Sequence, residues 1–219
     1  MPCTRGFPVA ENPTVYIVDD DARFARGLAR LVGAAGWEVR VFSSAVDFLG
    51  AVEPGTPGCV LLDVRMPGMK GPELHRTMLE REMRLPVIFL TGHGDVATSV
   101  DAMKMGAVDF LEKPVRMEQL VGTIREALVR GARNREVDRE RNELHARIER
   151  LSRREREVMG RVVAGRLNKQ IAAELGIALK TVKAHRAKVM QKMQARSVPE
   201  LVTMCQAAGL GTSPPAVRT

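Results

Sequence analysis

Residues 59–68 read CVLLDVRMPG, an apolar run that ends on the carboxylate of Asp63 and is followed by a Pro-Gly turn. A run of this kind is typical of a buried strand in a parallel sheet. A charge at the edge of a core is costly unless something compensates it. The rest of the chain must therefore supply the groups that Asp63 faces.

Short apolar runs alternate with helical patterns through the first half of the chain. This alternation predicts a doubly wound, five-stranded parallel α/β sheet with helices on both faces. The expected strands are 14–19, 37–42, 59–63, 86–91 and 107–111. The expected helices lie near 22–35, 44–51, 71–82, 95–105 and 115–129.

The carboxyl ends of parallel strands meet at one edge of the sheet, and here they carry Asp19, Asp20, Asp63, Thr91 and, just past the fifth strand, Lys113. Crowded carboxylates repel one another, and Mg²⁺ removes that conflict. Asp63 is then placed as a nucleophile that forms an aspartyl phosphate, with Lys113 and Thr91 holding the phosphoryl oxygens. Taken singly, the aspartates at 19–21 also fit a helix cap, Thr91 fits a strand end and Lys113 fits a surface lysine. The presence of all these groups at the strand ends together favours the phosphoryl site.

The chain of 219 residues is 45% hydrophobic and 27% charged, an ordinary composition for a folded soluble protein. Its N-terminus does not read as a signal peptide, and no apolar stretch approaches the roughly 18 residues of a membrane span. Cys3, Cys59 and Cys205 are far apart and lack metal-site spacing, so they are expected to be reduced thiols. We therefore expect a cytoplasmic protein without a membrane partner.

The net charge of +8 is unevenly distributed. Residues 1–129 contain 14 Lys/Arg and 17 Asp/Glu, whereas residues 130–219 contain 20 Lys/Arg and 9 Asp/Glu. An acidic N-terminal half and a basic C-terminal half indicate two domains with different partners. The partner expected for the basic domain is a polyanion.

Residues 130–150 hold 12 charged residues of both signs. Val137, Leu144, Ile148 and Leu151 could form one seam of a short coiled coil, although Arg141 interrupts it. A solvated linker helix fits the same pattern equally well.

Capping signals divide the last 69 residues into four expected helices. The first opens with the capping box SRRE at 152–155 and closes at Gly165. The second is expected to be capped by Asn168 and to end at Gly176. The remaining two cover 179–193 and, after a second capping box at 197–200, residues up to Ala208.

The second and third of these helices, within residues 168–192, have the pattern of a helix-turn-helix whose second helix enters the DNA major groove. On that helix, Val182, His185, Val189 and Met193 make a stripe that faces the core. Lysines and small residues occupy the opposite face, an arrangement suited to close approach to base edges. The residues expected to contact DNA are Lys180, Thr181, Lys183, Ala184, Arg186, Ala187 and Lys188. An ordinary amphipathic helix with a solvated basic face is the alternative.

Four motifs resemble those of a response-regulator receiver domain, which has a flavodoxin-like strand order. They are VDDD at 18–21, LLDVRMPG at 61–68, LTGHGD at 90–95 and DFLEKP at 109–114. The stretch from LSRREREVM through TVKAHRAKVMQKM resembles a LuxR-type DNA-binding domain. Together they resemble a two-component response regulator of the NarL/FixJ family, in its FixJ branch. One departure is Ala178, which stands where many relatives place a serine cap, a loss worth about 1 kcal/mol.

The resemblance implies roles for individual residues. Asp63 would be the phosphoacceptor, with Asp20, Asp63 and the Arg65 carbonyl on Mg²⁺ and Asp19 assisting directly or through water. Thr91 and Phe110 would be the switch pair, and Lys113–Pro114 would be a cis peptide. Arg65 and His93 would tune the lifetime of the phosphate. The family's usual dimer surface would lie at about 95–111.

The expected function is that of a phosphorylation-activated transcriptional regulator, which is not an enzyme beyond its own Mg²⁺-dependent phosphorylation and dephosphorylation. Its expected partners are a sensor histidine kinase, double-stranded DNA, RNA polymerase and, on phosphorylation, a second copy.

A haloacid-dehalogenase-like phosphatase is an alternative, but that family has a D-x-D nucleophile motif on its first strand, whereas Asp63 lies on the third expected strand. A constitutive DNA-binding protein with a vestigial receiver is another, and the intact acidic set argues against it. The expected organisation is a flexible N-terminus 1–12, receiver 13–130, charged helical linker 131–150, LuxR-type domain 151–210 and flexible tail 211–219.

Overall fold

The computed structural model describes residues 12–92 and 106–209. The expected helix 95–105 and His93 lie outside these ranges, as do nearly all of the two expected flexible ends. The chain divides into two compact units, Met1–Glu136 and Val137–Thr219. The division falls inside the expected linker 131–150, and the finer domain boundaries stay a prediction.

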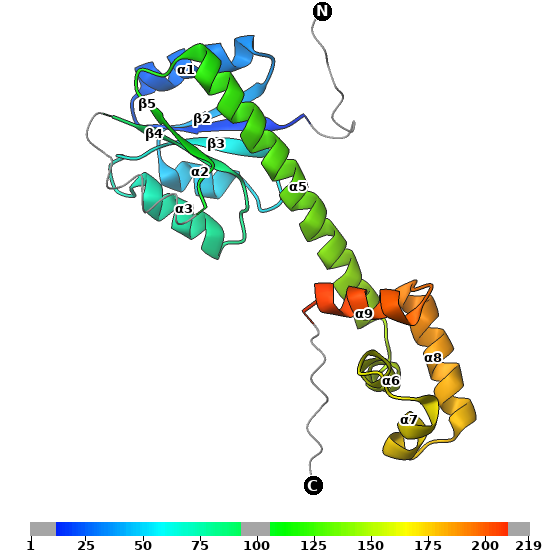
Figure 1. Cartoon of the computed structure of the whole chain (residues 1–219). Helices are drawn as coiled ribbons and strands as arrows, with labels where there is room; N and C mark the ends of the chain where they lie inside the picture. Colours follow the sequence, from blue (N-terminus) through cyan, green and yellow to red (C-terminus); the bar gives the residue numbers. More distant parts are fainter. Residues whose placement is uncertain (1–11, 93–105, 210–219) are drawn as a thin grey trace, which may run out of the picture. The chain divides into compact units, whose positions relative to one another are not determined.

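The first unit is built on a five-stranded parallel sheet with the order β2-β1-β3-β4-β5 (Figure 1). The predicted fold class is confirmed. Each strand bound agrees with the expected one or differs by one residue, except that the last strand begins two residues later than expected. The strands are β1 (Thr14–Val18), β2 (Glu38–Phe42), β3 (Gly58–Asp63), β4 (Val87–Thr91) and β5 (Asp109–Glu112).

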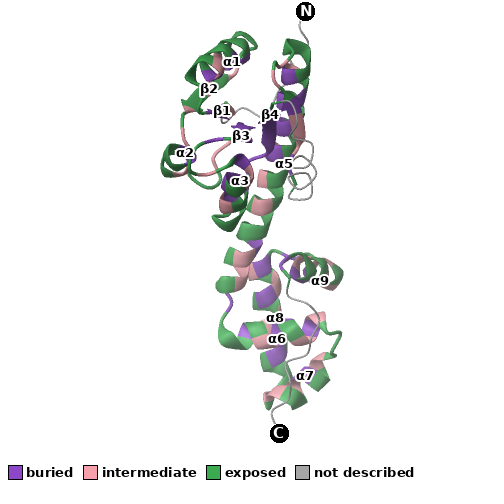
Figure 2. Ribbon diagram, turned by 90° about the vertical axis from the view of Figure 1, so that its left-hand side faces the viewer, coloured by how far each residue is buried: buried purple, intermediate pink, exposed green. Residues whose placement is uncertain are grey.

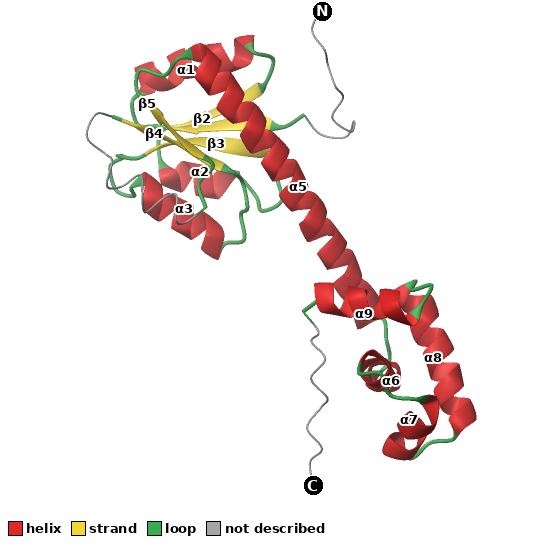
Figure 3. Ribbon diagram, in the orientation of Figure 1, coloured by secondary structure: helices red, strands yellow, loops and turns green. Residues whose placement is uncertain are grey.

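Helices cover both faces of this sheet (Figure 3), which explains why β3 and β4 are buried along their whole length. Helices α1 (Ala22–Ala34) and α5 (Met117–Glu149) pack on one face, where Ile17, Leu61 and Ile124 are buried together. Helices α2 (Ala45–Ala51) and α3 (Gly71–Glu80) pack on the other, against Leu62 and Phe89. Successive strand residues therefore feed two separate cores, as the alternation of side chains along a strand requires.

Helix α5 unites two expected elements, because the expected helix 115–129 and the charged linker form one helix, Met117–Glu149. Gly131 does not interrupt it: this glycine is buried and lies close to Pro86. Farther along, Leu144 and Ile148 pack with Leu151 in the core of the second unit, whereas Val137 is 63% exposed. Three of the four apolar side chains that a coiled coil would need therefore pack against residues of the same chain.

The second unit consists of α6 (Arg153–Val163), α7 (Asn168–Leu175), α8 (Leu179–Met193) and α9 (Val198–Ala207) around one apolar core. Buried positions alternate with exposed ones along these helices (Figure 2). The predicted capping box at 152–155 is confirmed, because Ser152 and Glu155 bond each other's backbone N–H groups. The one predicted at 197–200 is only half right: the Ser197 side chain accepts from Glu200 N–H, but Glu200 Oε2 accepts from the Arg196 N–H at 2.7 Å.

The expected cap at Asn168 is wrong. Leu167 is the N-cap of α7, and Gln170 Oε1 accepts its backbone N–H at 2.8 Å. Asn168 is instead the first helical residue, and its Oδ1 accepts a hydrogen bond of 2.8 Å from Arg186 on α8. A capping glutamine three residues past the N-cap makes a side-chain cap at Asn168 unnecessary. Gly176 does end α7 in the left-handed conformation, with φ 63°.

Glu155 joins the start of α6 to the end of α8. Its Oε2 accepts hydrogen bonds from the Ser152 backbone at 2.7 Å and from Lys192 Nζ at 2.6 Å. These two bonds lower the pKa of Glu155 from 4.5 to about 2, and the bond from Lys192 has the larger effect. The side chain is almost fully buried, so its charge depends on these partners.

We expect Glu155→Gln to lower the free energy of unfolding of the second unit by about 1–2 kcal/mol at neutral pH, because the capping bond can persist while the charged contact to Lys192 is lost. Unfolded Glu155 binds a proton at a higher pH than folded Glu155, so this stabilisation is present above about pH 4.5 and is lost as pH falls toward 2. Urea titrations followed by NMR signals of α6 and α8 would measure both effects.

The matched control is Glu157→Gln on the same helix, whose contacts to Arg153 and Arg154 are more exposed and contribute less than about 1 kcal/mol. Equal losses in the two variants, or a loss from Glu155→Gln that does not shrink in acid, would contradict the prediction.

Candidate functional site

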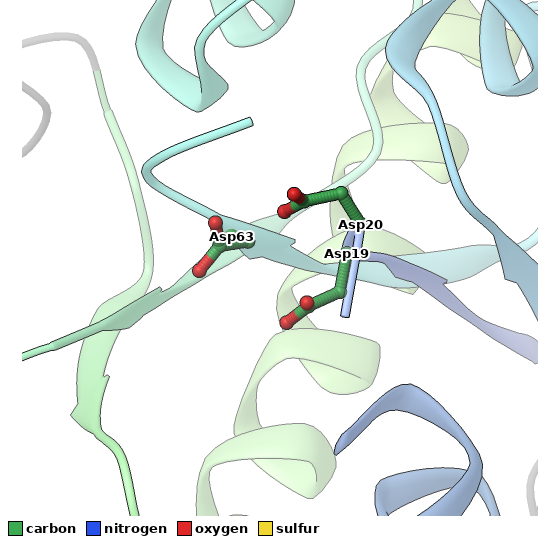
Figure 4. Close-up of side chains that lie close together, drawn as sticks. All are labelled: Asp19, Asp20 and Asp63. Atoms are coloured by element: carbon green, nitrogen blue, oxygen red, sulfur yellow. The ribbon is translucent and has the colours of Figure 1, made fainter. Parts of the chain in front are cut away.

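Three carboxylates gather at the carboxyl edge of the sheet. The register that pairs Val18 with Leu62 brings Asp19, just past β1, beside Asp63 at the end of β3. With Asp20, they offer ligand oxygens that all lie within 4.8 Å of one another (Figure 4). Asp19 and Asp63 are buried, at 1% and 7% exposure, whereas Asp20 is exposed. The cluster is therefore open to solvent on the side of Asp20.

Lys113 joins this cluster from the end of β5. Its Nζ lies 2.6 Å from Asp19 Oδ2 and 2.7 Å from Asp63 Oδ1, so one ammonium bridges two buried carboxylates. Its backbone N–H donates to the Thr91 carbonyl at 2.8 Å, which fixes β5 against the end of β4. The Lys113–Pro114 peptide is cis, as predicted.

Backbone groups hold the other carboxylate oxygens. The Arg65 N–H donates to Asp63 Oδ2 at 2.9 Å, and the Asp21 N–H donates to Asp19 Oδ1 at 3.0 Å. Asp21 itself caps α1, because its side chain accepts from the backbone of Arg23 and Phe24. The three successive aspartates thus have three different tasks: Asp19 bonds Lys113, Asp20 faces solvent and Asp21 starts the helix.

In the described part of the chain, the Lys113 ammonium contacts two of the three carboxylates, those of Asp19 and Asp63. Burial raises the pKa of Asp19, and the hydrogen bond and charge of Lys113 only partly offset that effect. Burial by itself would lower the pKa of Lys113, but its hydrogen bonds to Asp19 and Asp63 outweigh burial and raise it. A divalent cation held by the three carboxylates would add positive charge beside them.

The donor set fits Mg²⁺. This ion prefers a few carboxylate oxygens and keeps several waters, and it needs access from solvent, which exposed Asp20 provides. Asp19, Asp20 and Asp63 are the residues that would hold it. The part assigned to the Arg65 carbonyl stays a prediction.

Thr91 and Phe110 lie on the neighbouring strands β4 and β5. Thr91 ends β4 and is 8% exposed, while Phe110 is half-buried on β5 and stacks on Phe89 with ring centroids 5.2 Å apart. Arg65 is exposed beside Asp63, and the expected tuning residue His93 lies outside the described residues.

Two residues at this site were not identified from the sequence. Gly71 opens α3 so close to β3 that a Cβ atom there would collide with the Asp63 carbonyl oxygen. Phe24 on α1 places its ring beneath the Lys113 ammonium. The glycine just after the Pro-Gly turn was a visible signal for the first, whereas the second contact joins strand and helix positions far apart in the chain.

Helix α8 of the second unit carries the residues that are expected to contact DNA. Val182, Val189 and Met193 are buried, as predicted, and His185 is half-buried. Arg186, expected at the flank of the outward face, is half-buried, and its guanidinium donates to Asn168 Oδ1 at 2.8 Å. The methyl group of Ala178, the N-cap of α8, cannot accept a hydrogen bond, in line with the expected loss of a cap. The remaining candidates, all exposed, are Lys180, Thr181, Lys183, Ala184, Ala187 and Lys188.

Among the helices in residues 12–92 and 106–209, none combines the length and apolarity needed to cross a bilayer.

Comparison with known proteins finds two family models along the chain. The response regulator receiver domain matches residues 15–125, and the luxR family of bacterial regulatory proteins matches residues 149–205. The chain is 44% identical to response regulator protein TmoT of Ectopseudomonas mendocina, over 90% of this chain and 89% of that protein. It is 43% identical to transcriptional regulatory protein FixJ of Azorhizobium caulinodans, over 95% of this chain and 99% of that protein.

Solved structures agree with these sequence matches. The response regulator StyR is similar with a TM-score of 0.78 and 41% identity, covering 90% of this chain and 99% of StyR. Full-length FixJ from B. japonicum is similar with a TM-score of 0.54 and 40% identity, covering 92% of this chain and all of that one.

Proposed function

The chain belongs to the two-component response regulators that join a receiver to a LuxR-type DNA-binding domain, with FixJ among its relatives, and from this we propose that phosphorylation of Asp63 controls its binding to DNA. Such proteins are phosphorylation-dependent transcription regulators and not conventional enzymes. The observation that carries the assignment of Asp63 is the Lys113 ammonium, which bridges Asp63 and Asp19 beside the exposed carboxylate of Asp20.

In the proposed reaction, an Asp63 carboxylate oxygen attacks the phosphorus of a phosphohistidine on a sensor kinase, the P–N bond breaks and the imidazole leaves. Mg²⁺ held by Asp19, Asp20, Asp63 and the Arg65 carbonyl would supply positive charge to the phosphoryl oxygens. Lys113 moves its contact from Asp63 to a phosphoryl oxygen, where it stabilises the negative charge. Attack of water on the phosphorus would break the bond to the Asp63 oxygen, regenerate the carboxylate and release inorganic phosphate, so the protein would catalyse its own dephosphorylation, with Arg65 and His93 setting the rate.

The signal passes from the acceptor to the receiver surface through Thr91 and Phe110. The Thr91 hydroxyl would donate to a phosphoryl oxygen, and Phe110, half-buried against Phe89, would turn inward into the space that Thr91 leaves. This movement of Thr91 and Phe110 would shift the surface of the receiver from its unphosphorylated to its phosphorylated conformation. We place the resulting homodimer contact at about 95–111, of which residues 106–111 are described.

Dimerisation would present two α8 helices to a DNA site made of two half-sites. The second half of the chain, with 20 Lys/Arg and 9 Asp/Glu in residues 130–219, has the charge for this partner. We further propose RNA polymerase as a partner at promoters and a cytoplasmic location, where DNA and a kinase's cytoplasmic domain are both accessible.

The proposal is tested by mapping the binding sites of the protein on fragments of its own genome, with and without acetyl phosphate and Mg²⁺. We expect discrete protected sites that require treatment with acetyl phosphate, and a shift from monomer to dimer in light scattering. Wild-type protein that takes up phosphate and yet protects the same sites to the same extent as untreated protein would refute the control by phosphorylation.

A further inference from the structure

The aromatic ring of Phe24 lies against the ammonium group of Lys113. The Nζ atom is 4.3 Å from the ring centroid, within the range in which the electron-rich face of a ring attracts a cation. The same ammonium lies 2.6 Å from Asp19 and 2.7 Å from Asp63. Lys113 is therefore held by two carboxylates and by one uncharged group.

Local structure fixes the ring in that place. Phe24 lies in the first turn of α1, and its backbone N–H donates to the Asp21 side chain at 3.1 Å. Its ring also packs against the apolar cluster between α1, α5 and the sheet, next to the buried Ala25 and Leu28. The cap and the core together prevent the ring from moving far, so it can act as a fixed platform.

During the proposed phosphorylation, Lys113 loses its exclusive hold on Asp19 and Asp63 but keeps its contact with Phe24. Asp19 and Asp63 are both candidate metal ligands, and Asp63 also becomes the phosphoryl ester, so each of these carboxylates has a competing partner. A cation close by also repels the ammonium. The side chain of Lys113 is 23% exposed, so a path into solvent is open to it. The Phe24 ring binds neither metal nor phosphate, and its attraction for the ammonium persists throughout.

We propose that Phe24 is a positioning residue, which holds the Lys113 ammonium in the site while Asp19 and Asp63 turn to the cation and the phosphoryl group. This inference rests on the proposed function of Lys113. The phosphorylation rate at saturating Mg²⁺ should depend on the electron density of the ring. Mg²⁺ affinity should not weaken when the ring is altered, because an ammonium that leaves the site no longer repels the cation.

A series of fluorinated side chains separates this role from simple packing. Site-specific replacement of Phe24 by mono-, di- and trifluorophenylalanine weakens the negative face of the ring stepwise with little change in shape. The probe is acetyl phosphate with Mg²⁺, and the readout is the initial rate of phosphate uptake by the full-length protein. We expect a stepwise decrease that reaches about two- to fivefold, and a similar decrease in Phe24→Leu.

The same series at Phe48 is the matched control. Phe48 is fully buried on the opposite face of the sheet, against Tyr16 and Phe42, so fluorination there should leave the rate unchanged. NMR gives a readout independent of rate, because the ring face shifts the resonances of the Lys113 terminal methylene upfield. We expect this shift to disappear in Phe24→Leu, while calorimetric titration shows that Mg²⁺ binds at least as tightly.

A phosphorylation rate that stays constant across the Phe24 series would overturn the proposal. So would an equal decrease in the Phe48 series. Failure of the proposed function looks different: wild-type protein would then take up no phosphate, or Lys113→Ala would take it up as fast as wild type.

Discussion

Full-length Asp63→Asn is expected to take up no phosphate from acetyl phosphate, whereas the wild-type protein gains a single phosphate. The amide cannot act as the nucleophile, yet it has nearly the shape of the carboxylate and can still accept the hydrogen bond from the Arg65 backbone. Uptake by the wild-type protein should also stop when Mg²⁺ is removed by a chelator, because the crowded carboxylates repel one another and the proposed reaction relies on a cation to offset that repulsion. Intact-protein mass spectrometry measures both effects.

The matched control for this change is Asp21→Asn, two residues from Asp19 in the same acidic triplet. Asparagine caps helices as well as aspartate does, so α1 should be retained and uptake should continue. Phosphate found on Asp63→Asn would place the acceptor elsewhere. Uptake by wild-type protein that is insensitive to the chelator would remove the metal from the mechanism.

The acidic site could be predicted from sequence because its geometry follows from a simple rule. Once the apolar runs ending at Val18, Asp63 and Thr91 are taken as parallel strands, the residues at or just past their carboxyl ends must converge on one edge of the sheet. The structure adds what the rule leaves open: which oxygen faces which donor, and that Lys113 bridges Asp19 and Asp63.

The features that sequence patterns did not predict depend on contacts between distant positions. Asn168 has the chemistry of a helix cap, but Gln170 performs that task and leaves Asn168 to bind Arg186 on the next helix. The helix expected near 115–129 instead continues through Gly131, which lies against Pro86, to Glu149. Local propensity favours the other outcome in each case, and a tertiary contact accompanies the outcome that is observed.

The largest effect on DNA recognition is expected from Lys183→Ala, which should weaken binding of the phosphorylated protein to its specific site by about 1–3 kcal/mol and relax its sequence preference. Lys183 is exposed and lies close to the N-terminal end of α8, the part of a recognition helix that contacts base edges. The neighbouring Ala184 and Ala187 are small and exposed, so they let the helix approach the groove. Titrations on specific and scrambled duplexes at several salt concentrations would measure the loss.

Lys188→Ala is the matched control, because it removes the same exposed charge from the same helix farther from its N-terminal end. As a phosphate contact, Lys188 should contribute equally on every sequence, and its loss should reduce the salt dependence by about one unit of slope. Arg186 is also expected to contact a phosphate. Its guanidinium is already bonded to Asn168, which fixes the position from which it would make that contact. The decisive quantity is the ratio of specific to scrambled affinity: if it falls for Lys188→Ala and stays unchanged for Lys183→Ala, the base-reading part of α8 lies nearer its C-terminal end.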